Sequence, residues 1–309
     1  MTSMSGLPPP KPALAWIRRS FFSAAVALLL TCSPRAGTPG AAQPKERAVP
    51  HEPASRILFL HHSTGEAIWE AGLPQFFQAW NATHGTRYAI TEMTYPMANG
   101  GHTRLDRMLP TRVFRRLVHD RYPWENNPYD YWNLWVAHTG TARDRQEPNL
   151  DDLAASHDVI VFKHCFPVSR VLPEDGASSV ASPKKTLANY RLQYEALKTR
   201  MHQFPRTTFI VWTGPALTEA STTPEEAERA RQFATWVKET WDEKGDNIFV
   251  WDFRELETEG GLYLKPAHAD GPTNAHPSRT FAGKAAPLLG RRIVDVIEGR
   301  GDQSSLTGG

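Results

Sequence analysis

Short apolar runs alternate with amphipathic segments along most of this chain. The runs cover residues 57–60, 159–162, 209–212 and 248–251, and each is continuous rather than alternating. A continuous apolar run of this length is typical of a strand covered on both faces of a parallel sheet. Residues 88–95 alternate between apolar and polar positions and indicate one more strand. The pattern therefore predicts about five strands.

The segments between these strands carry apolar residues at helical spacing. Helices are predicted over residues 66–80, 186–203, 224–241 and 281–297. In the last of them Pro287 is expected either to kink the helix or to delay its start. Strands that alternate with helices imply right-handed crossovers between parallel strands. We therefore expect a flavodoxin-like, three-layer α/β/α sandwich with a parallel sheet of about five strands.

The two ends of the chain differ in composition from this central part. Residues 1–32 combine a positive start with an apolar stretch too short for a membrane span, which predicts an export signal. Its end resembles a bacterial lipobox, so export ends either in lipidation of Cys32 or in cleavage further on. Residues 33–54 predict a flexible linker, and residues 299–309 a disordered tail. A single domain at 55–298, periplasmic or extracellular, is expected, with a membrane contact only through Cys32.

Charge and cysteine content narrow the class further. The net charge is +2, and no basic stripe favours nucleic acid as a partner. Of the two cysteines only Cys165 lies in the predicted domain, so an internal disulfide is excluded there. The whole chain has 40% hydrophobic residues, and the domain is expected to be stabilised by its core alone.

One part of the domain has no helical or strand period, and we interpret residues 99–150 as an insertion over one end of the sheet. It is rich in aromatic residues: Tyr122, Trp124, Tyr129, Tyr131, Trp132 and Trp135. Two interpretations remain open for this cluster. It either forms a wall on which sugar rings stack or packs the core beneath a long loop.

Ser63 is the candidate nucleophile, because it follows directly after the first apolar run. A serine at a tight strand-to-helix turn exposes its hydroxyl and points backbone N–H groups toward an incoming acyl oxygen. The competing interpretation is structural. Ser63 and Glu66 have the spacing of a capping box, in which both residues only satisfy the helix end.

His276 is the candidate base that would take the proton of this serine. Asp270 or Asn274 is expected to orient the ring through its other nitrogen, unless a main-chain carbonyl does so. The competing interpretation is an ordinary loop histidine that precedes a helix capped by Ser278.

Metal binding and thiol chemistry are the alternatives to a serine site in this sequence. The histidines near the strand ends (His61, His62, His164 and His268) and Cys165 match no zinc-binding spacing, so neither a metal nor a cofactor is expected. Cys165 follows a buried strand, where a cysteine is either a nucleophile or inert packing.

Taken together, these segments resemble the SGNH/GDSL hydrolase superfamily over residues 56–297. Ser63 matches the nucleophile of the first block, and His276-Pro277-Ser278 matches the end of the last block. The resemblance implies oxyanion donors from the Ser63 amide, from a glycine after the second strand and from a side chain after the third. The candidates are Gly100 or Gly101 for the glycine, and His164 or Lys163 for the side chain.

The chain departs from the family pattern at three places. His61-His62 replaces the Gly-Asp pair before the serine, and Thr273 stands where the family has its aspartate. Lys163-His164-Cys165 replaces the family's Gly-x-Asn-Asp. These departures favour a divergent member.

The function implied by the resemblance is that of an exported serine esterase without a cofactor. Its substrate would be an ester, such as an acyl group on a carbohydrate or on cell-envelope material. Acyl transfer between sugars uses the same residues and stays open. The alternative is a catalytically inactive, envelope-binding lipoprotein that keeps the fold.

Overall fold

The computed structural model describes residues 54–96 and 124–309. The predicted export signal, most of the linker, Cys32, Gly100 and the first part of the insertion lie outside the described residues.

Five parallel strands form the central sheet, and this confirms the predicted fold class. They are β1 (Ala54–His61), β2 (Arg87–Thr94), β3 (Val159–Phe162), β4 (Thr208–Trp212) and β5 (Ile248–Trp251). Their order is β2-β1-β3-β4-β5. This is a doubly wound order. From β1 the chain adds β2 on one side and then β3, β4 and β5 on the other, so the strand order reverses between β1 and β3.

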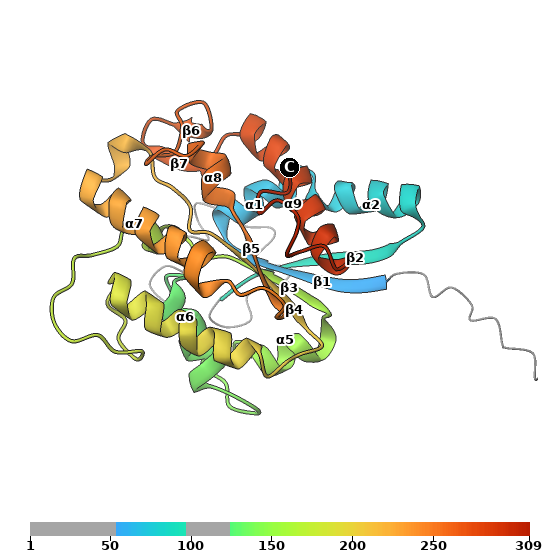
Figure 1. Ribbon diagram of the computed structural model, residues 1–309, viewed down its shortest axis with the longest axis horizontal. Helices are drawn as coiled ribbons and strands as arrows, with labels where there is room; N and C mark the ends of the chain where they lie inside the picture. Colours follow the sequence, from blue (N-terminus) through green and yellow to red (C-terminus); the bar gives the residue numbers. More distant parts are fainter. Residues whose placement is uncertain (1–53, 97–123) are drawn as a thin grey trace, which may run out of the picture. The chain divides into compact units, whose positions relative to one another are not determined.

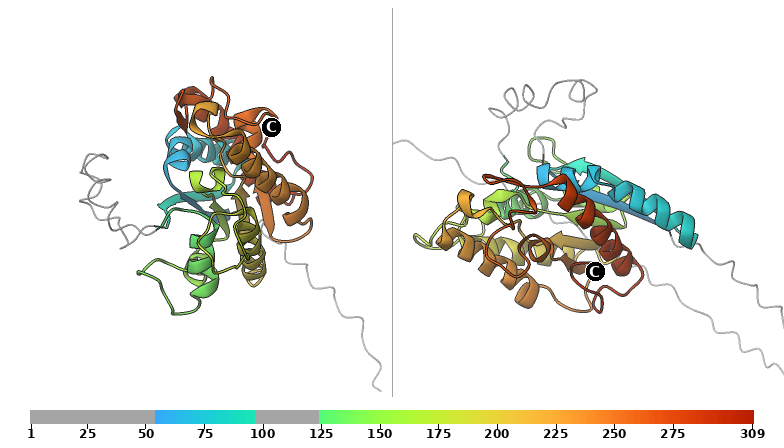
Figure 2. Two further views of the ribbon diagram at one scale, coloured as in Figure 1. Left: turned by 90° about the vertical axis from the view of Figure 1, so that its left-hand side faces the viewer. Right: turned by 90° about the horizontal axis from the view of Figure 1, so that it is seen from above.

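Helices cover both faces of this sheet (Figure 1). One face carries α4 (Pro128–Trp132), α5 (Leu150–Ser156), α6 (Leu187–Met201) and α7 (Pro224–Trp236). The other carries α1 (Ser63–Glu70), α2 (Leu73–His84) and α9 (Arg279–Ile297), and α2 and α9 lie side by side there (Figure 2). Shorter turns complete the chain: the π-helical η1 (Asn133–Ala137) and η4 (Val237–Trp241), the 3₁₀ turns η2 (Phe166–Ser169) and η3 (Glu219–Ser221), and α8 (Phe253–Thr258).

Alternation along the strands explains why both faces are apolar. In β1, Leu58 and Leu60 belong to the core cluster under α6 and α7, whereas Ile57 and Phe59 belong to the cluster under α1 and α9. Successive side chains of a strand point to opposite faces, so a strand between two helical layers needs an unbroken apolar run.

Two helices were predicted only approximately. The segment expected as one helix at 66–80 is divided into α1 and α2 at Gly72, whose φ of 120° is open to glycine but strained for other residues. Pro287 does not delay α9, which starts at Arg279 and contains the proline.

The segment expected as a loop around His276 is a short hairpin instead. It consists of β6 (Ala269–Gly271) and β7 (Asn274–Pro277), which pair antiparallel. His276 therefore lies on a strand, and Ser278 caps α9 by accepting from the Phe281 N–H.

The described part of the insertion supports the packing interpretation of its aromatic residues. Trp124, Tyr131 and Trp135 are buried in the core cluster under α6, and only Tyr129 and Trp132 are half-buried. The indole N–H of Trp135 finds a partner in the hydroxyl of Tyr95, as a buried indole requires.

The structure corrects the prediction of a disordered tail. Residues 299–309 pack against β5 and α9, where they supply acceptors to two buried donors. Arg292, only 1% exposed, donates to the carbonyl of Gly301 at 2.6 Å, and the Trp251 indole donates to the carbonyl of Thr307 at 3.0 Å. Buried N–H groups without acceptors are costly, so these two residues hold a polar, glycine-rich segment that has no apolar period of its own.

Candidate active site

Ser63 is the first residue of α1, just beyond the carboxyl end of strand β1. His62 is the N-cap residue, and its carbonyl accepts from Gly65 and Glu66 at 2.7 and 3.3 Å. The backbone N–H groups of Ser63 and Thr64 therefore make no hydrogen bond within the helix. The capping-box interpretation required Ser63 at the N-cap, which the structure contradicts. Within the described residues, the Ser63 hydroxyl makes no hydrogen bond.

Hydrogen bonds fix the ring of His276 on β7. Its Nδ1 lies 2.8 Å from Oδ1 of Asn274, which also accepts from the His276 backbone N–H at 3.2 Å. The Nδ2 of Asn274 donates to Oδ2 of Asp270 at 2.9 Å. Because the amide oxygen can only accept, Nδ1 must carry the proton, and the lone pair of the neutral ring is on Nε2. This is the tautomer that a general base requires.

Two of the three candidates for orienting His276, the side chains of Asn274 and Asp270, thus lie in a row rather than in competition. Asn274 touches the ring, and Asp270 touches only Asn274. Both side chains are solvent-exposed. The catalytic role of Asp270 stays a prediction, and the geometry allows it to act on His276 only through Asn274.

The fold brings Ser63 and His276 to the same edge of the sheet. Helix α1 packs against β7, and the ring of Phe166, which follows β3, lies edge-on to the His276 ring at 5.1 Å between centroids. No hydrogen bond joins Ser63 to His276 in the parts of the chain that the structure describes. Catalytic hydrogen bonds are often long before substrate binds, so this separation does not oppose the pairing.

Lys163, the first residue after β3, lies against the first turn of α1. It is 1% exposed, and its Nζ lies 3.4 Å from the Cys165 thiol. Its Cδ lies 3.2 Å from the position that a Cβ on Gly65 would occupy, and the same position is blocked by Cβ of His61. His61 thus excludes a side chain at Gly65, and the bare backbone of the first turn of α1 lies against this lysine. The half-buried Cys165 is a free thiol.

His164, the other side-chain candidate after β3, points to the opposite face. Its ring lies among the rings of Tyr131, Phe162 and Tyr194, under α6, and neither ring nitrogen has a partner in the described structure. Burial, aided by the nearby charge of Lys163, lowers the pKa of His164 to about 3. Of the two candidates, Lys163 is therefore the one on the side of the sheet that carries α1.

His62 is the second neutral histidine at this edge. Its Nε2 donates to the carbonyl of Pro96 at 3.0 Å. Burial, with a smaller contribution from the Lys163 charge, lowers its pKa to about 3 despite that hydrogen bond. His61 instead pairs with Glu92, whose Oε2 lies 2.8 Å from Nε2. The His61-His62 pair before Ser63 is thus engaged in packing and hydrogen bonds.

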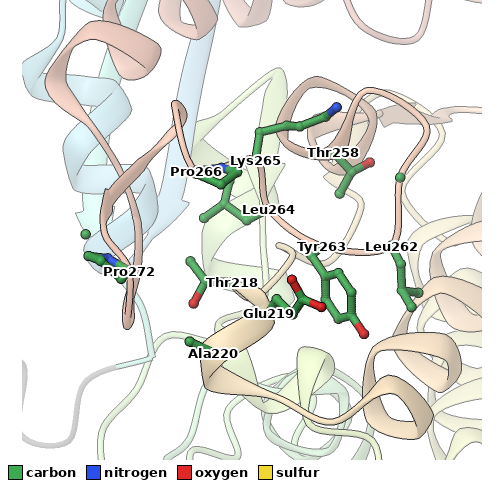
Figure 3. A pocket seen from close by; sticks show the side chains of 12 residues that line it. Thr218, Glu219, Ala220, Thr258, Leu262, Tyr263, Leu264, Lys265, Pro266 and Pro272 are labelled. Carbon is green, nitrogen blue, oxygen red and sulfur yellow. The ribbon is translucent and has the colours of Figure 1, made fainter.

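A cavity of about 640 Å³ lies beside the hairpin, away from this chemistry (Figure 3). Its walls come from η3, from the loop after α8 and from the hairpin turn, with Tyr263, Leu264 and Pro272 among them. Neither Ser63 nor His276 lines it. Sequence reasoning gave no signal for this cavity, because its walls are loops without a period.

Residues 54–96 and 124–309 contain neither a metal-binding cluster nor a membrane-spanning helix. No group of three or more His, Cys, Asp and Glu side chains is arranged to hold a metal ion there. In the same residues, no helix combines the length and apolar character needed to cross a membrane.

No family model and no curated protein matches the chain. Among solved structures it is similar to a family two carbohydrate esterase from Cellvibrio japonicus, with 13% sequence identity and a TM-score of 0.38. The match covers 81% of this chain and 63% of that protein, so the chain spans less than two thirds of its length. At this identity and TM-score no residue role is carried over.

Proposed function

We propose that this protein is an exported serine esterase in which Ser63 is the nucleophile and His276 the general base. One observation carries the proposal most directly. The hydrogen-bonded row Asp270–Asn274–His276 holds the ring in the tautomer of a base, on a strand packed against the helix that begins at Ser63. Orientation of a base by a third group is the arrangement that activates a serine hydroxyl.

The first half of the reaction acylates Ser63. Its Oγ attacks the ester carbonyl carbon, while His276 Nε2 takes the hydroxyl proton and the carbonyl electron pair moves onto oxygen. The resulting oxyanion faces the amides of Ser63 and Thr64 at the positive end of α1. The bond to the leaving alkoxide then breaks, and the alkoxide receives the proton from His276.

The second half repeats these steps with water. His276 removes a proton from water, and the hydroxide adds to the acyl carbon. The tetrahedral intermediate collapses to the free acid as Ser63 recovers its proton. The substrate class that we propose is an O-acyl ester of a carbohydrate or of cell-envelope material, in keeping with the predicted export signal.

A non-catalytic binding module is the second candidate. The observation in its favour is that a neutral amide, not a carboxylate, touches the ring of His276, and that no hydrogen bond joins this ring to Ser63. A neutral partner stabilises the imidazolium less than a carboxylate does, so weak or absent turnover is the signature of this candidate.

Hydrolysis of p-nitrophenyl esters, from acetate to longer acyl chains, tests the proposal. We expect turnover by the protein, with loss of at least 10³-fold in kcat for Ser63→Ala and for His276→Ala. Ser156→Ala on α5 and His84→Ala on α2 are matched controls at exposed positions and should retain activity. Full activity in Ser63→Ala would refute the nucleophile assignment. Without turnover, labelling of Ser63 by a fluorophosphonate decides between an esterase of narrow specificity and the binding module.

A further inference from the structure

We propose that the ammonium group of Lys163 stabilises the oxyanion that forms when Ser63 attacks an ester. This inference rests on the proposed function. It assigns a charged oxyanion donor at the place where the resembled family has an amide side chain, and it makes Lys163 a catalytic residue.

The first argument is that Lys163 is a buried cation without a counter-charge. It is 1% exposed, and no ion pair of Lys163 occurs in the described residues, where its Nζ contacts only the Cys165 thiol. Lys198, the other buried lysine in the described part of the chain, shows the usual arrangement, with Glu243 at 2.7 Å. An unpaired buried charge is costly, and a lysine position that serves packing alone would be served better by methionine.

Glu257, a buried carboxyl that interacts electrostatically with Lys163, does not supply the missing charge. Glu257 is fully buried, and one of its oxygens accepts from the Ala216 N–H at 2.7 Å while the other has no partner in the described structure. Burial raises the pKa of Glu257 to about 8, although Arg254 and Lys163 both act to lower it. The group is therefore mainly protonated near neutral pH, and it leaves the charge of Lys163 uncompensated.

The second argument is position. Alternation beyond β3 sends His164 into the core under α6 and sends Lys163 toward α1, where its side chain passes against Gly65 in the first turn. The amides of Ser63 and Thr64 begin the same turn. A cation against the first turn of α1 and two N-terminal amides of that helix favour the binding of a negative charge beside Ser63, even though the exposed Glu66 belongs to the same turn.

Replacement of Lys163 by methionine tests the inference. For Lys163→Met we expect kcat to fall by about 10²–10³-fold with KM within about threefold, because the charge acts only on the transition state. The melting temperature should stay the same or rise, since an unpaired buried charge is removed. Lys265→Met, at a half-exposed lysine near the hairpin, is the matched control and should behave as the parent. An unchanged kcat, or a change confined to KM, would overturn the inference.

Lys163→Gln separates charge from hydrogen bonding, because glutamine donates hydrogen bonds but carries no charge. The inference expects a comparable loss of kcat in both variants. Near-complete activity in Lys163→Gln would show that the charge is not required. This variant also replaces the methionine variant if the latter fails to fold.

A binding measurement keeps this inference distinguishable from the proposed function. Inorganic phosphate, a small tetrahedral anion, should raise the melting temperature of the parent and of Ser63→Ala, and this rise should disappear in Lys163→Met. If the parent hydrolyses no ester but phosphate binding still requires Lys163, the esterase proposal fails and the anion site stands. Equal stabilisation of the parent and Lys163→Met by phosphate would refute the anion site itself.

Discussion

Replacing His164 by phenylalanine should make the protein more stable, and more so in acid. The ring is buried among Tyr131, Phe162 and Tyr194, and both of its nitrogens lack partners in the described structure. An unsatisfied buried polar group costs about 1–3 kcal/mol, and phenylalanine removes both nitrogens without emptying the site. At pH 7.5 we therefore expect His164→Phe to raise the free energy of unfolding by about 1–3 kcal/mol.

The acid-dependent part follows from the pKa of His164, which burial lowers from 6.5 to about 3. Below pH 6.5 this histidine becomes protonated in the unfolded chain, whereas in the folded protein it stays neutral down to about pH 3. Stability is therefore lost as the pH falls through this window, at about 1.4 kcal/mol for each pH unit. At pH 5 the loss amounts to about 2 kcal/mol, so the advantage of the phenylalanine variant should grow to about 3–5 kcal/mol there.

Urea unfolding at pH 7.5 and pH 5 measures both parts. His164→Gln is the matched control, because it cannot take up a proton yet keeps buried polar atoms. It should remove the acid-dependent loss without the gain at pH 7.5. Destabilisation of His164→Phe at both pH values would refute the reasoning and show that the ring nitrogens have partners. The same variant should also retain esterase activity, because the ring faces away from α1.

The remaining predictions concern the hairpin, a buried carboxyl and the tail. The double exchange Asp270→Asn with Asn274→Asp places a carboxylate directly on the ring of His276. With p-nitrophenyl acetate as substrate, kcat should rise by about tenfold or more. A drop in kcat to the level of Asn274→Ala would contradict this expectation. Glu257 has a pKa raised to about 8 by burial, so its ionisation opposes folding increasingly from pH 4.5 to pH 8. Glu257→Gln should therefore be more stable by up to about 3 kcal/mol at pH 7 and by less than about 1 kcal/mol at pH 5, as urea unfolding would show. Deletion of residues 299–309 removes the acceptors of the buried Arg292 and Trp251 donors and should lower the free energy of unfolding by about 3 kcal/mol. An unchanged melting temperature would contradict this.

The sheet was predictable because its signal is local. Each central strand is an unbroken apolar run, such as residues 159–162, and its boundaries follow from the change to polar residues. The tail lacked such a signal. Its order depends on Arg292 and Trp251, which are distant in sequence and supply donors that its carbonyls satisfy. Long-range hydrogen bonds of this kind leave no period in the segment that they fix.

The candidate site likewise has a part that local sequence predicts and a part that only the fold determines. Ser63 and His276 were predicted from their places beside a strand and before a helix, and the structure puts their elements in contact. The order of the polar row was not predictable, because Asp270 and Asn274 both stood within reach of His276 in the sequence. The hairpin decides it: Asn274 and His276 are two residues apart on β7 and share a face, whereas Asp270 lies on β6.

Lys163 shows what strand geometry adds to a motif comparison. The resemblance offered Lys163 and His164 equally, since both follow β3 where the family has its amide donor. A one-residue difference on a strand reverses the face that a side chain reaches, so the two cannot serve the same site. Because β3 lies beside β1, the residue that points toward the α1 layer meets the first turn of α1, and the absence of a side chain at Gly65 admits it there. A cation at this point would stabilise a developing negative charge more strongly than a neutral amide does. A charged donor would thus offset, on the side of the oxyanion, the weaker support that a neutral Asn274 gives to the base.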